Sequence, residues 1–304
     1  MTEPNGPVRQ SGLVIVDKPG GMTSHDVVAR VRRLAGTKKV GHAGTLDPMA
    51  TGVLVVGVEK ATRLLGYLTL TEKEYAATIR LGQSTSTDDA EGEITRSAPA
   101  ADVSAETLHK AVAGLVGEIQ QVPPAVSAIK VGGQRAYKLT RAGAAPELPA
   151  RPVTVYEFTI TAVRREAELL EVDATVRCSS GTYIRALARD LGTALGTGGH
   201  LTRLRRTRVG GYSVQDARTL EQLADRFEVL PLAQAASAAF PRRNLTADEA
   251  RRLANGGRLA AAAGPDPQAS TGAQAPTAAF APDGTLIALV AEESGQARPL
   301  VVFA

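Results

Sequence analysis

The sequence predicts an α+β protein: a mixed, mainly antiparallel sheet flanked by helices, followed by a small β-rich domain at the C-terminus. Strand-like and helix-like apolar runs follow one another without the strict alternation that a parallel sheet requires. Beyond about residue 240, a short capped helix, a stretch rich in small residues and a hairpin pattern indicate a second unit. We expect a large domain over residues 1–238 and a small one over residues 239–304.

The first third of the chain predicts strands and helices in turn. A β-rich run over residues 12–19 ends at Pro19-Gly20-Gly21, and Thr23 or Ser24 then caps a helix with Val27, Val28, Val31 and Leu34 on one face. The remaining elements expected here are a strand over residues 53–58, a helix around 62–70 and an alternating strand over 75–81.

The middle of the chain holds a helix pattern, a hairpin and a long loop. Leu108, Val112 and Leu115 predict the helix, and Pro123-Pro124 ends the strand after it. Residues 124–152 are basic, contain glycine and proline and have little periodicity, which is typical of a functional or disordered loop. Strand runs over 153–163 and 169–177 predict a hairpin, and a helix follows through Leu187 and Leu191.

The last quarter predicts a short helix and a second hairpin. Thr246-Ala247-Asp248-Glu249 is a capping box, and the helix stops at Gly256-Gly257. Residues 260–277 are rich in alanine, glycine, proline and glutamine. The turn Pro282-Asp283-Gly284 separates strands over 278–281 and 286–291.

One loop, Gly41–Gly52, carries a single carboxylate between glycines and runs into the apolar segment 53–58. Its glycines permit positive φ and close backbone approach, and Pro48 favours an extended conformation at Asp47. A rigidly held acid at a sheet edge is a candidate for chemistry. In most loops, however, an Asp only caps or turns the chain, so both interpretations stay open at this point.

Charge and cysteine content narrow the classes of partner and compartment. The formal net charge is only +4, but the basic residues form three clusters, around residues 30–39, 130–141 and 203–208. Such clusters attract polyanions, although solvated helix faces are often equally basic. The one cysteine, Cys178, excludes an intrachain disulfide, and the four histidines show no zinc-ligand spacing. We expect a cytoplasmic protein because no signal-peptide core and no membrane-length apolar run is present.

Several common site motifs are absent or weak. There is no P-loop, no dinucleotide-binding glycine motif between a strand and a helix, and no hydrolase elbow. Asp88, Asp89, Glu91 and Glu93 could bind a metal, but acids this close in a turn-rich segment are more often a solvated loop. His42 alone is as well explained as a polar filler as a ligand or base, and Cys178 as a buried strand residue.

Five short motifs occur together in one order and cover roughly residues 12–215. They are Asp17-Lys18-Pro19-x-Gly21-Met22-Thr23-Ser24, the Gly41–Gly52 loop, Lys73-x-Tyr75 before Leu81-Gly82, Pro123-Pro124 with Ser127-Ala128-x-Lys130, and Cys178-Ser179-x-Gly181-Thr182-Tyr183-Ile184-Arg185. This set closely resembles the bacterial tRNA pseudouridine-55 synthases. The resemblance implies the pseudouridine synthase catalytic fold and isomerisation of uridine 55 in the tRNA T-loop, without cofactor or metal.

The resemblance also implies roles for individual residues. Asp47 matches the catalytic aspartate, Tyr75 the aromatic residue that stacks on the target base, and Arg185 the salt-bridge partner of the aspartate. Tyr183 and Leu204 resemble the wall of the active site, His42 the residue that stabilises flipped-out nucleotides, and Lys18 a supporting lysine. A carboxylate suits cleavage and re-formation of a glycosidic bond, and Arg185 would favour its ionised form.

The basic clusters are then expected to bind RNA. The expected RNA-binding residues are Lys130, Arg135, Lys138 and Arg141, in an inserted arm at about residues 124–152, and Arg203, Arg205 and Arg206. The C-terminal segment stands where relatives carry a PUA-type RNA-binding domain. We expect a monomer that acts on the tRNA T-arm without a membrane or an obligatory protein partner. The alternatives are an RNA-binding or RNA-folding protein without catalysis and a glycosidase-like enzyme on nucleosides, which would need a second acid.

Overall fold

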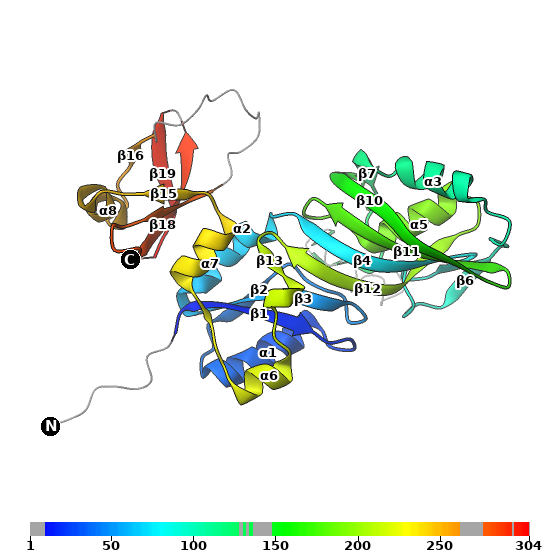
Figure 1. Cartoon of the computed structure of the whole chain (residues 1–304), viewed down its shortest axis with the longest axis horizontal. Coiled ribbons are helices and arrows are strands. Elements are labelled where there is room, and N and C mark those ends of the chain that lie inside the picture. Colours follow the sequence, from blue (N-terminus) through cyan, green and yellow to red (C-terminus); the bar gives the residue numbers. More distant parts are fainter. Residues whose placement is uncertain are drawn as a thin grey trace.

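A computed structural model describes residues 10–127, 130–131, 134–135, 148–261, 276–293 and 295–303 of the chain. Its main feature is a ten-stranded sheet in this described part, in which neighbouring strands pair antiparallel except β3 and β12 (Figure 1). In sheet order the strands are β14 (Leu230–Pro231), β1 (Gly12–Lys18), β3 (Thr51–Val58), β12 (Gly199–Val209), β4 (Lys73–Leu81), β11 (Leu169–Cys178), β10 (Arg151–Glu166) and β7 (Gly117–Gln121). Two short strands pair beside this path, β2 (Val40–Ala43) with β3 and β13 (Tyr212–Ser213) with β12.

Helices cover both faces of the β1–β3 half of the sheet. Helix α1 (Ser24–Ala35) begins at the capping box of Thr23, and its apolar stripe packs with α6 (Leu220–Asp225) on one face. A 3₁₀ helix (Glu59–Leu64), α2 (Leu65–Thr69) and α7 (Leu232–Ala239) cover the opposite face. A second 3₁₀ turn, Val214–Asp216, leads from β13 toward α6.

The other half of the sheet is covered on one face. Helices α3 (Ala105–Ala113) and α5 (Ile184–Ala194) pack on β4, β10, β11 and β12 through an apolar cluster that includes Ile79, Leu187 and Leu191. On the opposite face, Arg80, Glu171 and Asp173 form ion pairs instead. Two short ribbons, β5 (Gln83–Thr85) with β6 (Ile94–Ser97) and β8 (Lys130–Val131) with β9 (Gln134–Arg135), complete this half. Helix α5 therefore lies on the one face of this half of the sheet that carries the apolar core.

A five-stranded sheet forms the C-terminal unit at one end of the molecule (Figure 1). Its order is β15 (Arg242–Asn244), β17 (Thr277–Phe280), β18 (Leu286–Glu293), β19 (Gln296–Val302) and β16 (Leu259–Ala260), with α8 (Ala247–Ala254) packed against it. Phe280, Leu286 and Phe303 share a core with β1, β3 and α7, so the two units are packed together. No helix of the described residues is long and apolar enough to cross a membrane.

The predicted fold class is confirmed, with four differences of detail. The loop expected over Gly41–Gly52 begins with a strand, because β2 pairs with β3 through Gly41 and His42. The helix expected around residues 62–70 is a 3₁₀ helix followed by the short α2, and the helix over 108–115 ends at Ala113. Strand β12 was not predicted, since four arginines between residues 203 and 208 hide the apolar alternation of a strand.

Candidate active site

Asp47 lies in a pocket of about 270 Å³ between the β2–β3 loop, β4, β12 and the start of α5. The pocket is lined by Gly44, Thr45, Leu46, Asp47, Thr69, Lys73, Tyr75, Ser127, Ser179, Gly181, Thr182, Tyr183, Ile184, Arg185, Leu204 and Arg206. Five of the seven residues expected at the active site are among them, Asp47, Tyr75, Tyr183, Arg185 and Leu204, together with Arg206, which was expected to bind RNA. Asp47 and Arg185 are 138 residues apart in the chain. The fold therefore brings together motifs that are distant in the sequence.

The backbone on both sides of Asp47 is fixed by buried polar side chains. The Ser24 hydroxyl accepts a hydrogen bond from the Leu46 amide (2.9 Å) and donates to the Leu46 carbonyl (3.1 Å). The Lys18 ammonium donates to the carbonyl of Pro48 (3.1 Å) and to that of Met22 (2.6 Å). Lys18 and Ser24 thus both support the loop through contacts with its main chain. For Ser24 the sequence predicted only a possible role as a helix cap.

Arg206 holds the other end of the same loop. Its guanidinium donates to the carbonyls of Gly44 (3.0 Å), Thr45 (3.4 Å) and Val53 (2.8 Å). Gly52 has a φ of +98°, and a Cβ there would lie 2.2 Å from the Arg206 carbonyl oxygen. This glycine is required because β12 passes directly against the loop.

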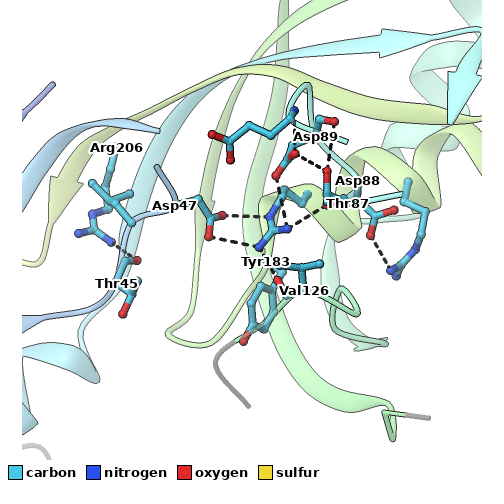
Figure 2. Close-up of polar contacts among 12 residues, drawn as sticks. Thr45, Asp47, Thr87, Asp88, Asp89, Val126, Tyr183 and Arg206 are labelled. Carbon is cyan, nitrogen blue, oxygen red and sulfur yellow. Dashed lines mark hydrogen bonds and ion pairs between the residues drawn. The ribbon is translucent and has the colours of Figure 1, made fainter. Parts of the chain in front are cut away.

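Arg185 connects the Asp47 loop to two other segments, and Figure 2 labels the three residues that it joins, Asp47, Thr87 and Val126. Its Nε lies 3.0 Å from one carboxylate oxygen of Asp47 and its Nη2 lies 3.2 Å from the other. The same guanidinium donates to the carbonyls of Thr87 and Val126, both at 2.9 Å, and its Nη1 lies 3.4 Å from Asp89. The expected Asp47–Arg185 pair is present, and a buried second carboxylate shares the arginine.

The segment 88–93 is not the solvated loop that its composition favours. Asp89 is buried against Arg185, and Asp88 pairs with Arg189 of α5 at 3.1 Å. Of the four acidic residues in this segment, only Glu91 and Glu93 are exposed. The preference for a solvated loop was wrong for the two aspartates, since their cationic partners lie about 100 residues further along the chain.

Burial is the main influence on the Asp47 carboxyl group. It raises the pKa of Asp47 above the ordinary value of 3.8, and the negative charge of Asp89 raises it further. Arg185 opposes both effects, as the sequence analysis expected of it. The pKa nevertheless stays raised, because burial outweighs the effect of Arg185 although about a third of the side chain reaches solvent.

Aromatic and apolar side chains form the remaining walls. Tyr75 in β4 and Leu204 in β12 are buried with the core under α5, and burial raises the pKa of both Tyr75 and Tyr183. The Gln121 amide holds Tyr183 through its main chain: Nε2 donates to the Tyr183 carbonyl (3.1 Å), and Oε1 accepts from the Tyr183 amide (2.8 Å). Gln121 was missed by the sequence analysis, and nothing in its local sequence distinguishes it from Gln120.

His42 lies in β2 beside the loop and is not one of the residues that line the pocket. Its ring is 5.6 Å from the ring of His25 at the start of α1, in a T-shaped arrangement. Burial, followed by the proximity of His25, lowers the pKa of His42, so the neutral imidazole is favoured near neutral pH. Its Nδ1 is buried and makes no hydrogen bond to any residue that the structure describes.

The expected RNA-binding residues separate into three environments. Strand alternation turns Arg206 into the pocket beside Leu204, whereas Arg203 is exposed and Arg205 pairs with Asp17 through two contacts of 2.7 and 3.0 Å. Lys130 and Arg135 lie in the β8–β9 ribbon. Lys138 and Arg141 lie outside the described residues.

The chain matches three family descriptions in succession. Residues 32–184 match the TruB family pseudouridylate synthase (N terminal domain), residues 185–235 the tRNA pseudouridylate synthase B C-terminal domain, and residues 240–304 the tRNA Pseudouridine synthase II, C terminal. The tRNA pseudouridine synthase B of Arthrobacter sp. (strain FB24) is 64% identical over 97% of both chains. That of Thermobifida fusca (strain YX) is 61% identical over 96% of this chain and 98% of its own.

Solved structures show the same fold. A chain in a Cbf5-Nop10-Gar1 complex superposes with a TM-score of 0.72 at 27% identity, over 97% of this chain and 84% of that one. A chain in an H/ACA RNP bound to a substrate RNA containing 2'-deoxyuridine superposes with a TM-score of 0.70 at 25% identity, over 100% of this chain and 92% of that one. The chain therefore belongs to the TruB family of pseudouridylate synthases, and it is an isomerase that converts uridine to pseudouridine.

Proposed function

We propose that this protein isomerises the uridine at position 55 in the T-loop of tRNA, with Asp47 as the catalytic carboxylate. Its relatives in Arthrobacter and Thermobifida are tRNA pseudouridine synthases, which supports tRNA as the substrate. The observation that carries the role of Asp47 is its position: a carboxylate ion-paired to Arg185 inside a pocket beside the buried ring of Tyr75.

The proposed reaction rearranges one nucleotide without net addition or loss. The C1′–N1 bond breaks, a C1′–C5 bond forms, the proton on C5 leaves to solvent, and N1 takes up a proton. A positioned carboxylate can serve this sequence as a nucleophile or as a base. Asp47 is the one carboxylate among the lining residues of the pocket, whereas Asp89 sits behind Arg185.

The position of Asp47 inside the pocket favours a flipped-out nucleotide as substrate. A uridine inside a folded RNA loop cannot reach a carboxylate at this depth, so the enzyme must extrude it at a cost of a few kcal/mol. Stacking on Tyr75 would offset part of that cost, with Tyr183 and Leu204 as walls. His42 would stabilise the displaced nucleotides from the rim of the loop.

The remaining expectations belong to the same proposal. Arg203, Arg205, Arg206 and the arm residues Lys130, Arg135, Lys138 and Arg141 would bind RNA phosphates. We also propose that residues 1–238 form the catalytic domain, with the arm inserted at about residues 124–152, and that residues 239–304 form a PUA-like RNA-binding domain. The protein would act in the cytoplasm as a monomer, without cofactor or metal.

The test uses a tRNA T-arm hairpin that carries tritium at C5 of the target uridine. The wild-type protein should release the label, because C5 exchanges its hydrogen for the bond to C1′. Asp47→Asn should lower the release rate by several orders of magnitude and leave hairpin binding within about threefold, since only the reacting group changes. Asp102→Asn, a change at an exposed turn, is the matched control and should release label at the wild-type rate.

Three outcomes would contradict the proposal. Absence of release by the wild type would reject the T-arm uridine as the substrate. Full activity of Asp47→Asn would reject the catalytic role of the carboxylate. Loss of hairpin binding together with activity in this variant would make Asp47 a binding residue instead.

A further inference from the structure

We propose that Lys73 and Arg206 form an anion subsite in the wall of the catalytic pocket, which binds the RNA phosphate next to the target nucleotide. The inference rests on the proposed function, because it assumes that a nucleotide of an RNA chain enters the pocket. Both residues line this pocket together with Thr69, Gly44 and Thr45. Neither has a part in the reaction described above.

The two cations lie on the sheet face that carries Tyr75. Arg206 in β12 is the cross-strand partner of Tyr75 in β4. Lys73 precedes Tyr75 by two residues on the same strand, so its side chain lies on the same face. Arg185 lies across the pocket, at the start of α5. A base stacked on Tyr75 would therefore have Asp47 and Arg185 on one side and the pair of cations on the other.

Neither cation is neutralised by the protein. Lys73 is 5% exposed and Arg206 is 1% exposed, and within the described ranges neither has a carboxylate within ion-pair distance. The Lys73 ammonium donates to the carbonyls of Thr69 and Thr71, and Arg206 donates to three carbonyls of the Asp47 region. Buried charges are normally paired, and two neighbouring cations also repel each other. This arrangement is expected of a site whose counter-charge arrives with the substrate.

Donor groups remain available for such a substrate. An ammonium has three N–H donors, of which Lys73 uses two, and a guanidinium has five, of which Arg206 uses three. Burial, followed by the neighbouring positive charge of Arg206, lowers the pKa of Lys73 to about 8. An incoming anion would reverse that effect and hold Lys73 protonated.

A phosphate matches the subsite better than the uracil ring does. A phosphodiester carries a full negative charge before, during and after the reaction. It can therefore balance the charge of two buried cations throughout. The uracil oxygens gain charge only while the glycosidic bond is broken. The target nucleotide is joined to phosphates on both sides, so a base at Tyr75 brings one of them to the pocket wall.

The experiment replaces single phosphates in the T-arm hairpin by uncharged methylphosphonates, either 5′ or 3′ to the target uridine. For the wild-type protein, one of the two replacements should lower kcat/KM by about 10- to 100-fold, the effect expected of a charge-assisted hydrogen bond. The other replacement, and one placed three nucleotides away, should change it by less than about threefold.

The variant Lys73→Gln tests whether Lys73 is the group that binds this phosphate. On the unmodified hairpin this variant should lose about as much kcat/KM as the wild type loses on the sensitive methylphosphonate hairpin. Combining both changes should cost little more than either alone, because each removes the same interaction. Lys110→Gln, an exposed lysine on α3 outside the pocket, is the matched control and should behave as wild type on every hairpin.

A second measurement needs only the wild-type protein. On the unmodified hairpin, kcat/KM should fall at alkaline pH as Lys73 loses its proton, with a pKa of about 8. On the sensitive methylphosphonate hairpin this fall should be weaker. The groups that face Lys73 are Arg206, Tyr75 and Cys178, and the pKa of the Cys178 thiol is raised to about 11. Lys18, whose pKa is also about 8, affects both hairpins alike.

The outcomes separate this inference from the proposed function. If the wild type converts the unmodified hairpin but tolerates methylphosphonates on both sides, or shows the same pH profile on both hairpins, the phosphate subsite is rejected. If the effects of Lys73→Gln and the methylphosphonate multiply, Lys73 does not bind that phosphate; a loss in kcat alone would then indicate the uracil oxygens as its partner. If the wild type converts no hairpin, the proposed function itself fails.

Discussion

At the scale of residues, the charge state of Asp47 is set by opposing neighbours. Burial and Asp89 raise its pKa, and Arg185 lowers it. The proposed role of Asp47 as nucleophile or base requires the ionised carboxylate, so we expect activity to fall as the pH drops through this raised pKa. In this proposal Arg185 favours the ionised form of Asp47 and also holds the carboxylate in place.

Two substitutions should move the acid limb of the pH profile in opposite directions. Arg185→Gln removes the charge that lowers the pKa of Asp47, so the limb should shift to higher pH, with kcat/KM at pH 7 reduced on the order of 100-fold. Asp89→Asn removes a like charge and should shift the limb to lower pH. The measurement is kcat/KM for tritium release between pH 5 and pH 8.

Shifts of the same sign in both variants would contradict this electrostatic account. Asp225→Asn, at the end of α6, provides a control that changes a carboxylate far from the pocket lining and should leave the profile unchanged.

At the scale of elements, the end of β7 and the start of α5 are joined at the active site. Gln121 at the end of β7 pairs with the main chain of Tyr183, and the carbonyl of Val122 accepts a hydrogen bond from Arg189 of α5 at 2.7 Å. The carbonyl of Val126 accepts from Arg185. The segment that leads from β7 into the basic stretch is thereby tied to the helix that carries the arginine of the active site.

Gln121→Ala should loosen Tyr183 without removing any group that touches the substrate. The Tyr183 amide loses its partner, which costs about 1–3 kcal/mol, whereas the Tyr183 carbonyl keeps its hydrogen bond from the Leu187 amide (3.2 Å). We expect kcat to fall about tenfold while KM changes less than about threefold, because the orientation of the site is affected more than RNA binding. Steady-state kinetics on the T-arm hairpin measures both constants.

Gln120→Ala is the matched control, since it changes the same residue type at the neighbouring, exposed position of β7. Equal kinetic losses in both variants would show that the effect comes from the strand as a whole and not from the pairing with Tyr183.

At the scale of the whole molecule, one apolar cluster joins the C-terminal sheet to the large sheet. Phe280 and Leu289 belong to the same cluster as Leu13 of β1, Val55 of β3 and Ala235 of α7. Two long-range hydrogen bonds add to it, from Lys60 to the Phe303 carbonyl (2.9 Å) and from Arg63 to the Val302 carbonyl (2.5 Å). The C-terminal unit thus stabilises the half of the sheet that carries the Asp47 loop.

Phe280→Ala should destabilise both units together. Truncating a fully buried phenylalanine costs about 3–5 kcal/mol, and the cavity lies in the shared cluster. Amide hydrogen exchange in β1 and β3 should accelerate accordingly. Leu253→Ala, in the separate cluster between α8 and its own sheet, is the control and should accelerate exchange mainly within the C-terminal unit.

Faster exchange confined to the C-terminal unit in Phe280→Ala would show that the shared cluster does not couple the two units.

Much of the fold could be predicted from local patterns. The helix cap at Thr23, the hairpin of β10 and β11 and the hairpin around Pro282-Asp283-Gly284 each have a periodicity or turn chemistry that acts within a few residues. Strand β12 could not be predicted in this way. Its arginines are stabilised by partners such as Asp17 and the carbonyls of Thr45 and Val53, which lie 153 to 188 residues away.

The candidate site shows the same division. Asp47, Tyr75 and Arg185 stand in motifs that the sequence displays directly. Gln121, Ser24 and Asp89 act through main-chain or ion-pair contacts with distant residues, and no local signal predicts those contacts. His42, which the sequence associates with the site, lies beside the pocket in β2 and contacts His25.

The sequence by itself determined the fold class, the family resemblance and the acid that stands at the centre of the site, because periodicity and motif order are local properties of the chain. Only the tertiary structure decided which charges meet. Strand alternation directs Arg206 into the pocket and leaves Arg203 exposed, and chain folding places Asp89 behind Arg185 and Arg206 opposite Tyr75. The pKa of Asp47 and the unpaired cations of the pocket wall follow from these distances, which depend on residues far apart in the sequence.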